Sequence, residues 1–211
     1  MSKGRLIITN LIGILVVFAL VAGGGYYYYQ SENYVKTDEA KVAGDIEQVV
    51  APAAGQLKEW NVQEGNTVSK DAVVGKVLEG ENTVSVTSMM KGTIVKKQAN
   101  DHQLVQAGQV LAQTIDMDHL YITANLKETE IKDIETGDSV DIVVDGDPDT
   151  TFEGEIEEIG YATNSVFSLM PQQNSSGNYT KVTQKVPVKI SLKDPSDKVL
   201  PGMNAEVKIS K

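Results

Sequence analysis

Two neighbouring stretches decide the fold of the middle of the chain. Residues 49–79 read VVAPAAGQLKEWNVQEGNTVSKDAVVGKVLE, and residues 86–116 read VTSMMKGTIVKKQANDHQLVQAGQVLAQTID. When one is slid against the other by 37 positions, small and apolar residues coincide without a gap. The coincident pairs are Gly55 with Gly92, Leu57 with Ile94, Val62 with Ala99, Val68 with Val105, Val73 with Val110, and Val74 with Leu111. Such a repeat indicates two copies of one unit that bury a shared core.

Each copy is expected to consist of short strands. Turn-forming residues divide the apolar positions in Glu64-Gly65-Asn66, Ser69-Lys70-Asp71 and Ala107-Gly108-Gln109. Apolar positions that alternate between such close turns are typical of strands and not of helices. We therefore predict a β-sandwich over residues 47–116, to which both copies contribute.

A long uncharged segment precedes the repeat. Residues 11–29 read LIGILVVFALVAGGGYYYY, and as a helix they extend roughly 28 Å, enough for the hydrocarbon core of a bilayer. Its strongly apolar residues together favour insertion by about 3–5 kcal/mol. These residues are Leu11, Ile12, Ile14, Leu15, Val16, Val17, Phe18, Leu20 and Val21. The sequence predicts a transmembrane anchor within residues 1–30, with a cleaved signal peptide as the alternative.

The flanking charges predict how this anchor is oriented. Lys3 and Arg5 precede it, whereas the ten residues after Tyr29 hold one Lys and three acids. The positive-inside rule then places the N-terminus in the cytoplasm and the remaining chain outside. We expect a single-pass protein of the cell membrane with an extracytoplasmic body.

The chain from residue 117 onward alternates with a period of two. The apolar positions are Val140, Ile142 and Val144; Val186, Val188, Ile190 and Leu192; and Met203, Ala205, Val207 and Ile209. One helix is expected over 127–134, where Glu128 and Lys132 are spaced i,i+4 and Gly137 follows as a stop. The fold class is mainly β, with a small antiparallel barrel over 117–211 assisted by a first strand within 31–46. Pro187 then belongs at an edge or a bulge.

Composition excludes several classes of function. The net charge is −10, and residues 31–211 hold 17 basic against 29 acidic groups, which disfavours nucleic-acid binding. The absence of Cys excludes thiolate zinc sites, Cys nucleophiles and iron–sulfur clusters. No phosphate-binding loop, GxSxG or HExxH motif occurs. We predict no catalytic residue, no metal ligand and no cofactor, and hence a protein that is not an enzyme.

Four local features have structural interpretations. The acidic run 145–149 lacks the Gly and Glu of a calcium loop, since Thr150 and Ile156 stand there, so we expect an acidic turn. His102 falls opposite Gly65 in the repeat and is expected in a turn. Trp60 is expected in the core or on a sheet surface. Met89-Met90-Lys91 looks like a biotin-type box, but Lys91 falls opposite Ala54, away from the junction of the two copies.

One polar stretch carries exposed apolar candidates. Residues 164–179 lack periodicity, yet they contain Phe167, Leu169 and Met170. Apolar residues in an exposed loop mark a contact with a partner or a membrane. The alternative is that they cover the end of the barrel.

The order of these parts resembles one family. The two copies are similar to the half-motifs of the lipoyl/biotinyl fold, and residues 34–46 resemble the opening strand of membrane fusion proteins (periplasmic adaptors) of the HlyD/EmrA type. LYITANLKETEIKDIETGDSVDIVVDG (120–146) resembles the barrel of that family. FSLMPQQNSSGNYTKVTQKVPVKISL (167–192) is similar to the EmrA branch in particular.

The resemblance implies a membrane-anchored adaptor of a multidrug or toxic-compound exporter. Such adaptors work with a transporter of the inner or cytoplasmic membrane, here of the major facilitator type, and form homo-oligomers. Most carry a coiled-coil hairpin between the lipoyl halves, but only Gly80 to Ser85 join them here. Direct docking to an outer-membrane channel is therefore not expected. A stand-alone extracytoplasmic module that binds a ligand or cell-wall polymer is the alternative, and copurification of a pump separates the two.

Overall fold

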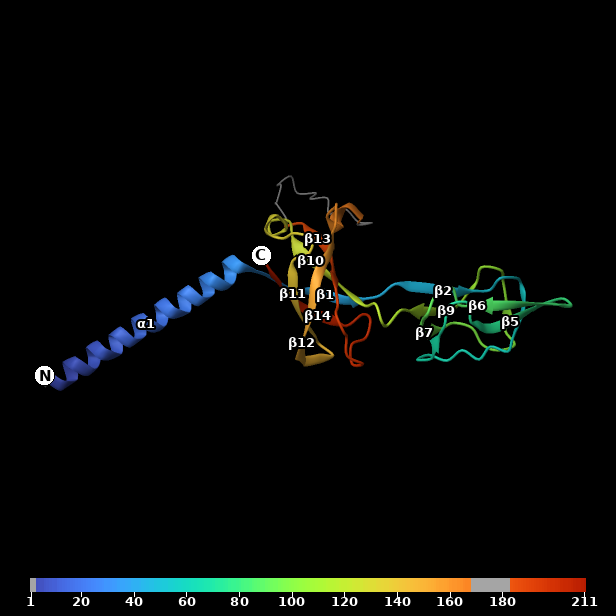
Figure 1. The fold of residues 1–211 in the computed structure, drawn as a ribbon, viewed down its shortest axis with the longest axis horizontal. Helices are drawn as coiled ribbons and strands as arrows, with labels where there is room; N and C mark the ends of the chain where they lie inside the picture. The colour runs from blue at the N-terminus through green and yellow to red at the C-terminus, as the bar shows by residue number, and fades with distance from the viewer. Residues whose placement is uncertain (1–2, 168–182) are drawn as a thin grey trace, which may run out of the picture.

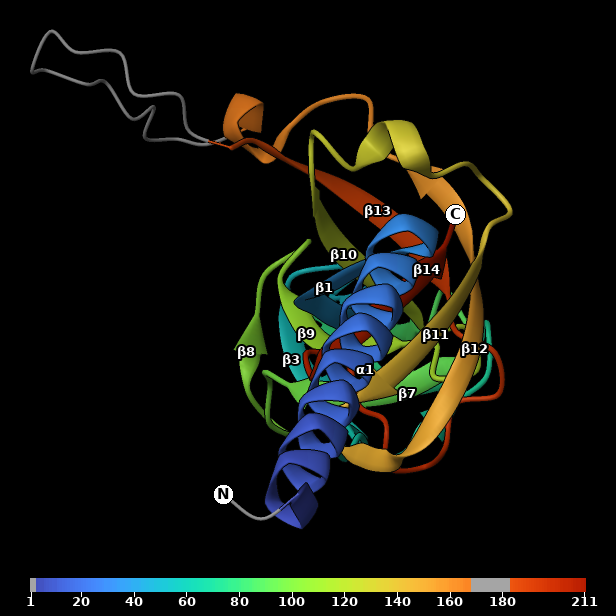
Figure 2. The ribbon, with the colours of Figure 1, turned by 90° about the vertical axis from the view of Figure 1, so that its left-hand side faces the viewer.

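The computed structural model describes residues 3–167 and 183–211. The helix α1 (Lys3–Asn33) projects from one side of a β-barrel, and a β-sandwich lies on the other side (Figure 1). The view from the helix side agrees, because α1 stands in front of the barrel strands (Figure 2). The barrel lies in the middle because the chain passes through it once, builds the sandwich, and then returns.

The barrel is closed by six antiparallel strands in the order β1-β10-β13-β12-β11-β14. Their bounds are β1 (Tyr34–Ala43), β10 (Tyr121–Lys127), β11 (Ser139–Val144), β12 (Asp147–Ile159), β13 (Lys185–Ser191) and β14 (Asn204–Ser210). Closure leaves no unpaired edge strand in this unit. The predicted small antiparallel barrel is thus confirmed.

Alternation places the predicted side chains inside this barrel. Val140, Ile142 and Val144 of β11 are buried, as are the matching positions of β13 and β14. The latter are Val186, Val188, Ile190, Ala205, Val207 and Ile209. All of these residues except Val186 belong to one core with the buried side chains of β1 and β10, so the strand that precedes the sandwich helps to fill the barrel.

Two local expectations need correction or refinement. The helix expected over 127–134 is only a three-residue 3-10 helix, η1 (Ile131–Asp133), because β10 continues to Lys127 and too few residues remain to nucleate an α-helix. Pro187 lies within β13, opposite Asn125. Its carbonyl accepts the N–H of Gly160 at 2.8 Å. Gly160 follows Ile159, the last residue of β12, so the pairing of β12 with β13 ends at Pro187. The backbone N–H that Pro187 lacks is therefore missing only at the end of this pairing.

The sandwich consists of two four-stranded sheets with the orders β2-β9-β7-β4 and β6-β5-β3-β8. The first holds β2 (Ile46–Val50), β9 (Val110–Ile115), β7 (Gly92–Lys97) and β4 (Thr67–Val68). The second holds β6 (Asn82–Thr87), β5 (Val73–Glu79), β3 (Gly55–Lys58) and β8 (Leu104–Val105). A shift of 37 positions maps one order onto the other, strand by strand. Each sheet contains strands of both copies, so the prediction that the copies fold together is confirmed.

Hydrogen bonds between the copies follow the same shift. The N–H of His102 donates to the carbonyl of Leu57 at 2.8 Å, and the N–H of Gly65 donates to the carbonyl of Ile94 at 2.8 Å. His102 and Gly65 both have positive φ, 64° and 88°, as expected for equivalent turn residues. The two halves therefore hold each other through reciprocal backbone bonds, and neither half has these bonds alone.

A tight turn joins the two copies. Strands β5 and β6 pair from Val73 to Glu79, and the last pair is Glu79 with Asn82. Only Gly80 and Glu81 remain for the loop, and Gly80 has φ +61°. This hairpin forms the end of the sandwich that lies farthest from α1 (Figure 1).

The helix α1 has 31 residues. Among residues 3–167 and 183–211, no helix combines the length and apolar character that a membrane crossing requires. The anchor expected over residues 11–29 remains a prediction.

Candidate functional site

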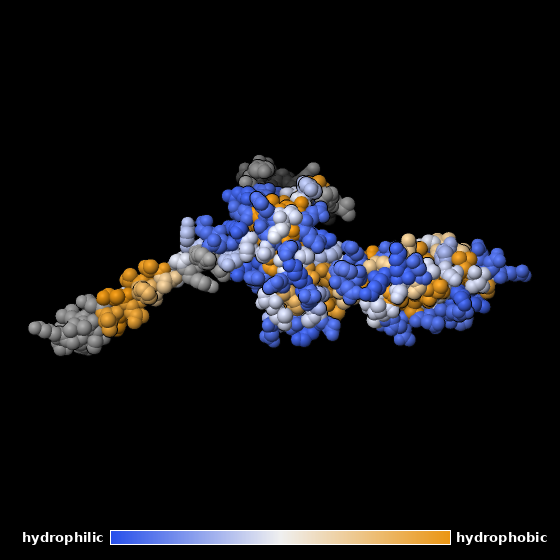
Figure 3. Space-filling model, viewed as in Figure 1, coloured by the Kyte–Doolittle hydropathy of each residue, from blue (hydrophilic) through white to orange (hydrophobic). Residues whose placement is uncertain are grey.

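The helix α1 presents apolar side chains that the barrel does not cover. The nine residues from Leu11 to Val21 that the sequence singles out are between 51% and 74% exposed. In Figure 3 they form a continuous apolar band, whereas the barrel surface in view is mainly hydrophilic. This band is a candidate surface for contact with an apolar environment.

The joint between sandwich and barrel is packed. The two chain crossings are residues 44–45 and 116–120. A side chain added at Gly44 would lie 2.7 Å from Ile115 and 3.0 Å from Leu120. Ile115 and Leu120 are both buried in the barrel core. The crossings therefore pack against each other, and the two bodies share apolar contacts at this joint.

Charged pairs surround the second crossing. Lys91 contacts Asp118 at 2.5 Å, and His119 Nδ1 lies 2.8 Å from Asp116. The hydrogen bond to Asp118 raises the pKa of Lys91, and the hydrogen bond to Asp116 raises the pKa of His119. Burial opposes ionisation of Asp116, but the hydrogen bonds from His119 and the Asp118 N–H lower its pKa. Lys91 thus bridges the sandwich to the crossing, as an exposed lysine in an ion pair.

The acidic turn expected over 145–149 is confined to Asp145 and Gly146, which join β11 to β12, whereas residues 147–149 already belong to β12. Asp147 differs from its neighbours because it is only 4% exposed. Its carboxylate accepts hydrogen bonds from Lys198 and Ser196, both at 2.9 Å. The bond from Lys198 and then that from Ser196 lower its pKa. Asp147 therefore fastens this turn to the segment before β14, a role that the sequence pattern does not reveal.

The sequence-derived contact residues are only partly described. Leu169 and Met170 lie outside the described residues, and Phe167 ends the 3-10 helix η2 (Asn164–Phe167). Val166, which precedes Phe167 in the same apolar run, is 68% exposed, and Tyr161, which the sequence does not single out, is 99% exposed. The described part of this loop therefore already carries exposed apolar surface.

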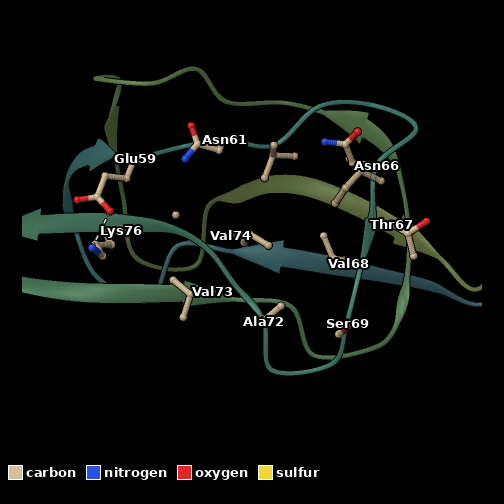
Figure 4. Close-up of a pocket in the computed structure, with 13 residues that line it drawn as sticks. Glu59, Asn61, Asn66, Thr67, Val68, Ser69, Ala72, Val73, Val74 and Lys76 are labelled. Atoms are coloured by element: carbon tan, nitrogen blue, oxygen red, sulfur yellow. Dashed lines mark ion pairs between the residues drawn. The ribbon is translucent and has the colours of Figure 1, made fainter.

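A groove of about 430 Å³ lies on the sandwich (Figure 4). Asn61 and Asn66 lie on one rim, Ala72 and Ser69 lie on the opposite rim, and Val74 lies between them. Lys76 and Glu59 form an ion pair of 2.6 Å at one end. Trp60, next to Glu59, is buried in the sandwich core, and its Nε1 donates to the carbonyl of Ala99 at 2.9 Å.

Comparison with known proteins identifies the lineage. Residues 45–116 match the family described as the YhbJ barrel-sandwich hybrid domain, and residues 120–209 match the YknX-like beta-barrel domain. YhbJ of Bacillus subtilis (strain 168), which is named as a candidate efflux system component, is 68% identical over 210 residues. That alignment covers 100% of this chain and 95% of the relative. The chain belongs to the membrane fusion protein family.

Other members of the family match over part of their length. The multidrug export protein EmrA of Escherichia coli (strain K12) is 32% identical over 109 residues, which are 51% of this chain and 28% of the relative. The matched part is thus little more than a quarter of that relative's length.

Solved structures of membrane fusion proteins share the fold. The periplasmic adaptor protein EmrA superposes with a TM-score of 0.57 at 12% identity, over 85% of this chain and 99% of that one. Spr0693 of Streptococcus pneumoniae R6 superposes with a TM-score of 0.60 at 14% identity, over 83% and 97%. The barrel and the intertwined sandwich are thus the architecture of this membrane fusion protein.

Proposed function

We propose that this membrane fusion protein is the adaptor subunit of an efflux transporter. The observation that carries the proposal is the arrangement of one helix, one closed barrel and one intertwined sandwich on a single chain (Figure 1). Relatives with this architecture are named as efflux or multidrug export proteins. The stand-alone binding module finds no support among them.

The partner in this proposal is a transporter of the cytoplasmic membrane, of the major facilitator type. The helix α1 anchors the adaptor through the apolar band from Leu11 to Val21, with the N-terminus in the cytoplasm and the body outside. The exposed side chains of this band and the uncharged run 11–29 support this topology. The chain then divides into an anchor (1–30), a linker and first barrel strand (31–46), a lipoyl-like domain (47–116) and the barrel domain (117–211).

The proposed mechanism is steric and not catalytic. Several copies assemble beside the transporter, and the β-domains form a passage or support at its exit. The two-residue turn at Gly80 and Glu81 stands where longer adaptors carry a coiled coil, which argues against direct docking to an outer-membrane channel. Phe167, Leu169 and Met170, together with the exposed Tyr161 and Val166, form the proposed contact with the transporter.

Deletion and complementation test this proposal. We expect deletion of the gene to lower export of a toxic compound while the abundance of the transporter stays normal. Wild-type protein restores export and copurifies the transporter. A variant with Leu15→Lys and Phe18→Lys leaves the membrane fraction and fails to restore export, whereas Gln48→Lys, an exposed substitution on β2, restores it. Unchanged export in the deletion strain contradicts the adaptor role, and capture of a soluble ligand without a transporter supports the binding module.

A further inference from the structure

The groove of Figure 4 arises where the two copies of the sandwich stop being alike. In the second copy β7 stays paired with β9 as far as Lys97 and Ala112, and the N–H of Gln98 donates to the carbonyl of Leu111 at 2.8 Å. In the first copy the pairing of β3 with β5 ends at Lys58 and Lys76. Among the described residues, no bond joins the N–H of Asn61 to the carbonyl of Val74, the equivalent pair.

The difference has a local cause at Glu59 and Trp60. In the second copy a bulge at Val95 absorbs one extra residue, so the strand continues. In the first copy the strand breaks at Glu59, which has φ +53°. The Trp60 ring turns into the core and lies so close to Gly75 that an added Cβ there would be 2.6 Å from the ring. The counterpart of Gly75 is Ala112, so the glycine makes room for a ring that only the first copy has.

This break leaves one edge of β5 without a paired strand, at a place where Val73 is exposed but Val74 and Gly75 are buried. β6 pairs with β5 from Val73 onward, but β3 reaches only to Lys76. The side of Val73 to Gly75 that faces the groove therefore has no neighbouring strand. Val73 is 56% exposed, whereas its counterpart Val110 is partly buried.

The groove begins where the pairing of β3 with β5 ends, at Lys58 and Lys76. The side chains that line it are compatible with an added strand. Apart from the ion pair of Glu59 with Lys76, the side chains that line it are uncharged. Three residues in extended conformation span about 10 Å. An added strand would gain backbone hydrogen bonds to the sheet, while small side chains fit between the rims.

We propose that this groove binds an extended polypeptide segment of a partner protein, which adds a strand beside Val73 to Gly75. The second copy supplies the template, because its own Lys97 and Gln98 lie against Ala112 and Leu111 of β9, the counterparts of Gly75 and Val74. The segment that fits has a free backbone edge and small, uncharged side chains toward the groove. This interaction goes beyond the adaptor role and is independent of the anchor.

A peptide of the template strand tests the proposal. The probe is the capped peptide Thr-Ile-Val-Ser-Ser-Gln-Ala, which copies residues 93–99 of this chain with serine in place of Lys96 and Lys97, because the groove is expected to take small, uncharged side chains. It is titrated into the full chain while the emission of Trp60 is followed, because Trp60 is the only tryptophan and lies beside the groove. We expect a saturable change in emission. The same peptide with N-methylated backbone amides should bind at least about tenfold more weakly.

Matched variants locate the binding. Thr67→Tyr narrows the groove from β4, and Leu104→Tyr makes the same change at the equivalent, exposed position of β8. We expect the first to weaken peptide binding at least about tenfold and the second to leave it within about twofold. If Thr67→Tyr does not fold, Asn66→Tyr replaces it. No saturable change at millimolar peptide, equal binding of the methylated peptide, or an equal loss in both variants overturns the proposal and leaves the adaptor role untouched.

Discussion

Replacing Gly55 with alanine should destabilise the sandwich strongly. An added Cβ would lie 2.1 Å from the carbonyl oxygen of Leu78 and 2.8 Å from its carbonyl carbon. Because the obstacle is main chain and not a flexible side chain, β3 and β5 must separate by about 1 Å, and overpacking of this kind costs about 3 kcal/mol or more. Gly92, the equivalent residue, would place a Cβ 2.7 Å from the carbonyl oxygen of Ile115. Gly92→Ala should therefore cost less than Gly55→Ala, but in the same direction.

Urea unfolding followed by Trp60 emission measures this cost. The tryptophan is buried in the sandwich, so its emission reports that unit and not the barrel. For a domain of this size a slope near the lower end of the usual range, about 1 kcal/mol per molar urea, converts 3 kcal/mol into a midpoint shift of roughly 3 M. Hydrogen exchange in β12 checks that the barrel remains folded.

Gly80→Ala provides the control. Gly80 has φ +61°, yet an added Cβ there meets no atom within 4 Å. This substitution should cost only the penalty of a left-handed alanine, about 1–2 kcal/mol. If Gly55→Ala costs no more than Gly80→Ala, the close approach of β3 to the carbonyl of Leu78 is wrong, and so is the argument that the two halves require glycine at the equivalent positions 55 and 92.

Three further outcomes are expected. Leu57→Ala and Ile94→Ala remove equivalent, fully buried side chains, so each should destabilise the whole sandwich by about 2–5 kcal/mol in the same Trp60 assay; loss of only one half in either variant contradicts the intertwined fold. Asp147→Asn should lower the stability of the barrel at neutral pH, and the difference should shrink in acid. Because the pKa of Asp147 lies below its usual value, its stabilisation is present above that usual value and is lost as pH falls through the folded-state pKa; thermal unfolding across pH tests this. His119 has a raised pKa, so its charge stabilises the fold below the usual histidine pKa and this contribution disappears as pH rises through the folded value; an NMR titration that finds the pKa of His119 at or below the usual value refutes the pairing with Asp116.

Periodicity predicted the parts of the fold that are set by which side chains must avoid water. The alternation in 140–144, 186–190 and 205–209 was sufficient to identify three barrel strands and their inward faces, because in a strand every second residue faces the core. The repeat was sufficient for the sandwich, since a pattern that recurs after 37 positions without a gap requires equivalent environments at both places. Both the barrel strands and the sandwich repeat were predictable because apolar side chains are buried at regular positions.

The remaining features depend on backbone register and on single partners, which periodicity does not encode. The buried carboxylate of Asp147 looks in the sequence like any other acid of an exposed turn, and its partners Ser196 and Lys198, 49 and 51 residues away, explain its burial. The helix expected over 127–134 has suitable i,i+4 charges, but strand pairing with β13 extends to Lys127 and removes its first turn. A sequence signal for the groove did exist, because Trp60 stands opposite Lys97, a pair that differs in size, charge and hydrophobicity.

The departure from symmetry also bears on how such an adaptor works. Two copies related by a shift of 37 positions present two nearly equivalent sides, so a single partner has no physical reason to prefer one side of a symmetric sandwich. The inward ring of Trp60 and the strand break at Glu59 make one side different while the reciprocal bonds of the core remain. A strand that binds beside Val73 would therefore fix the rotational position of the sandwich relative to its partner. Because the packed joint at Gly44 couples the sandwich to the barrel, that orientation would extend to the part of the molecule next to α1.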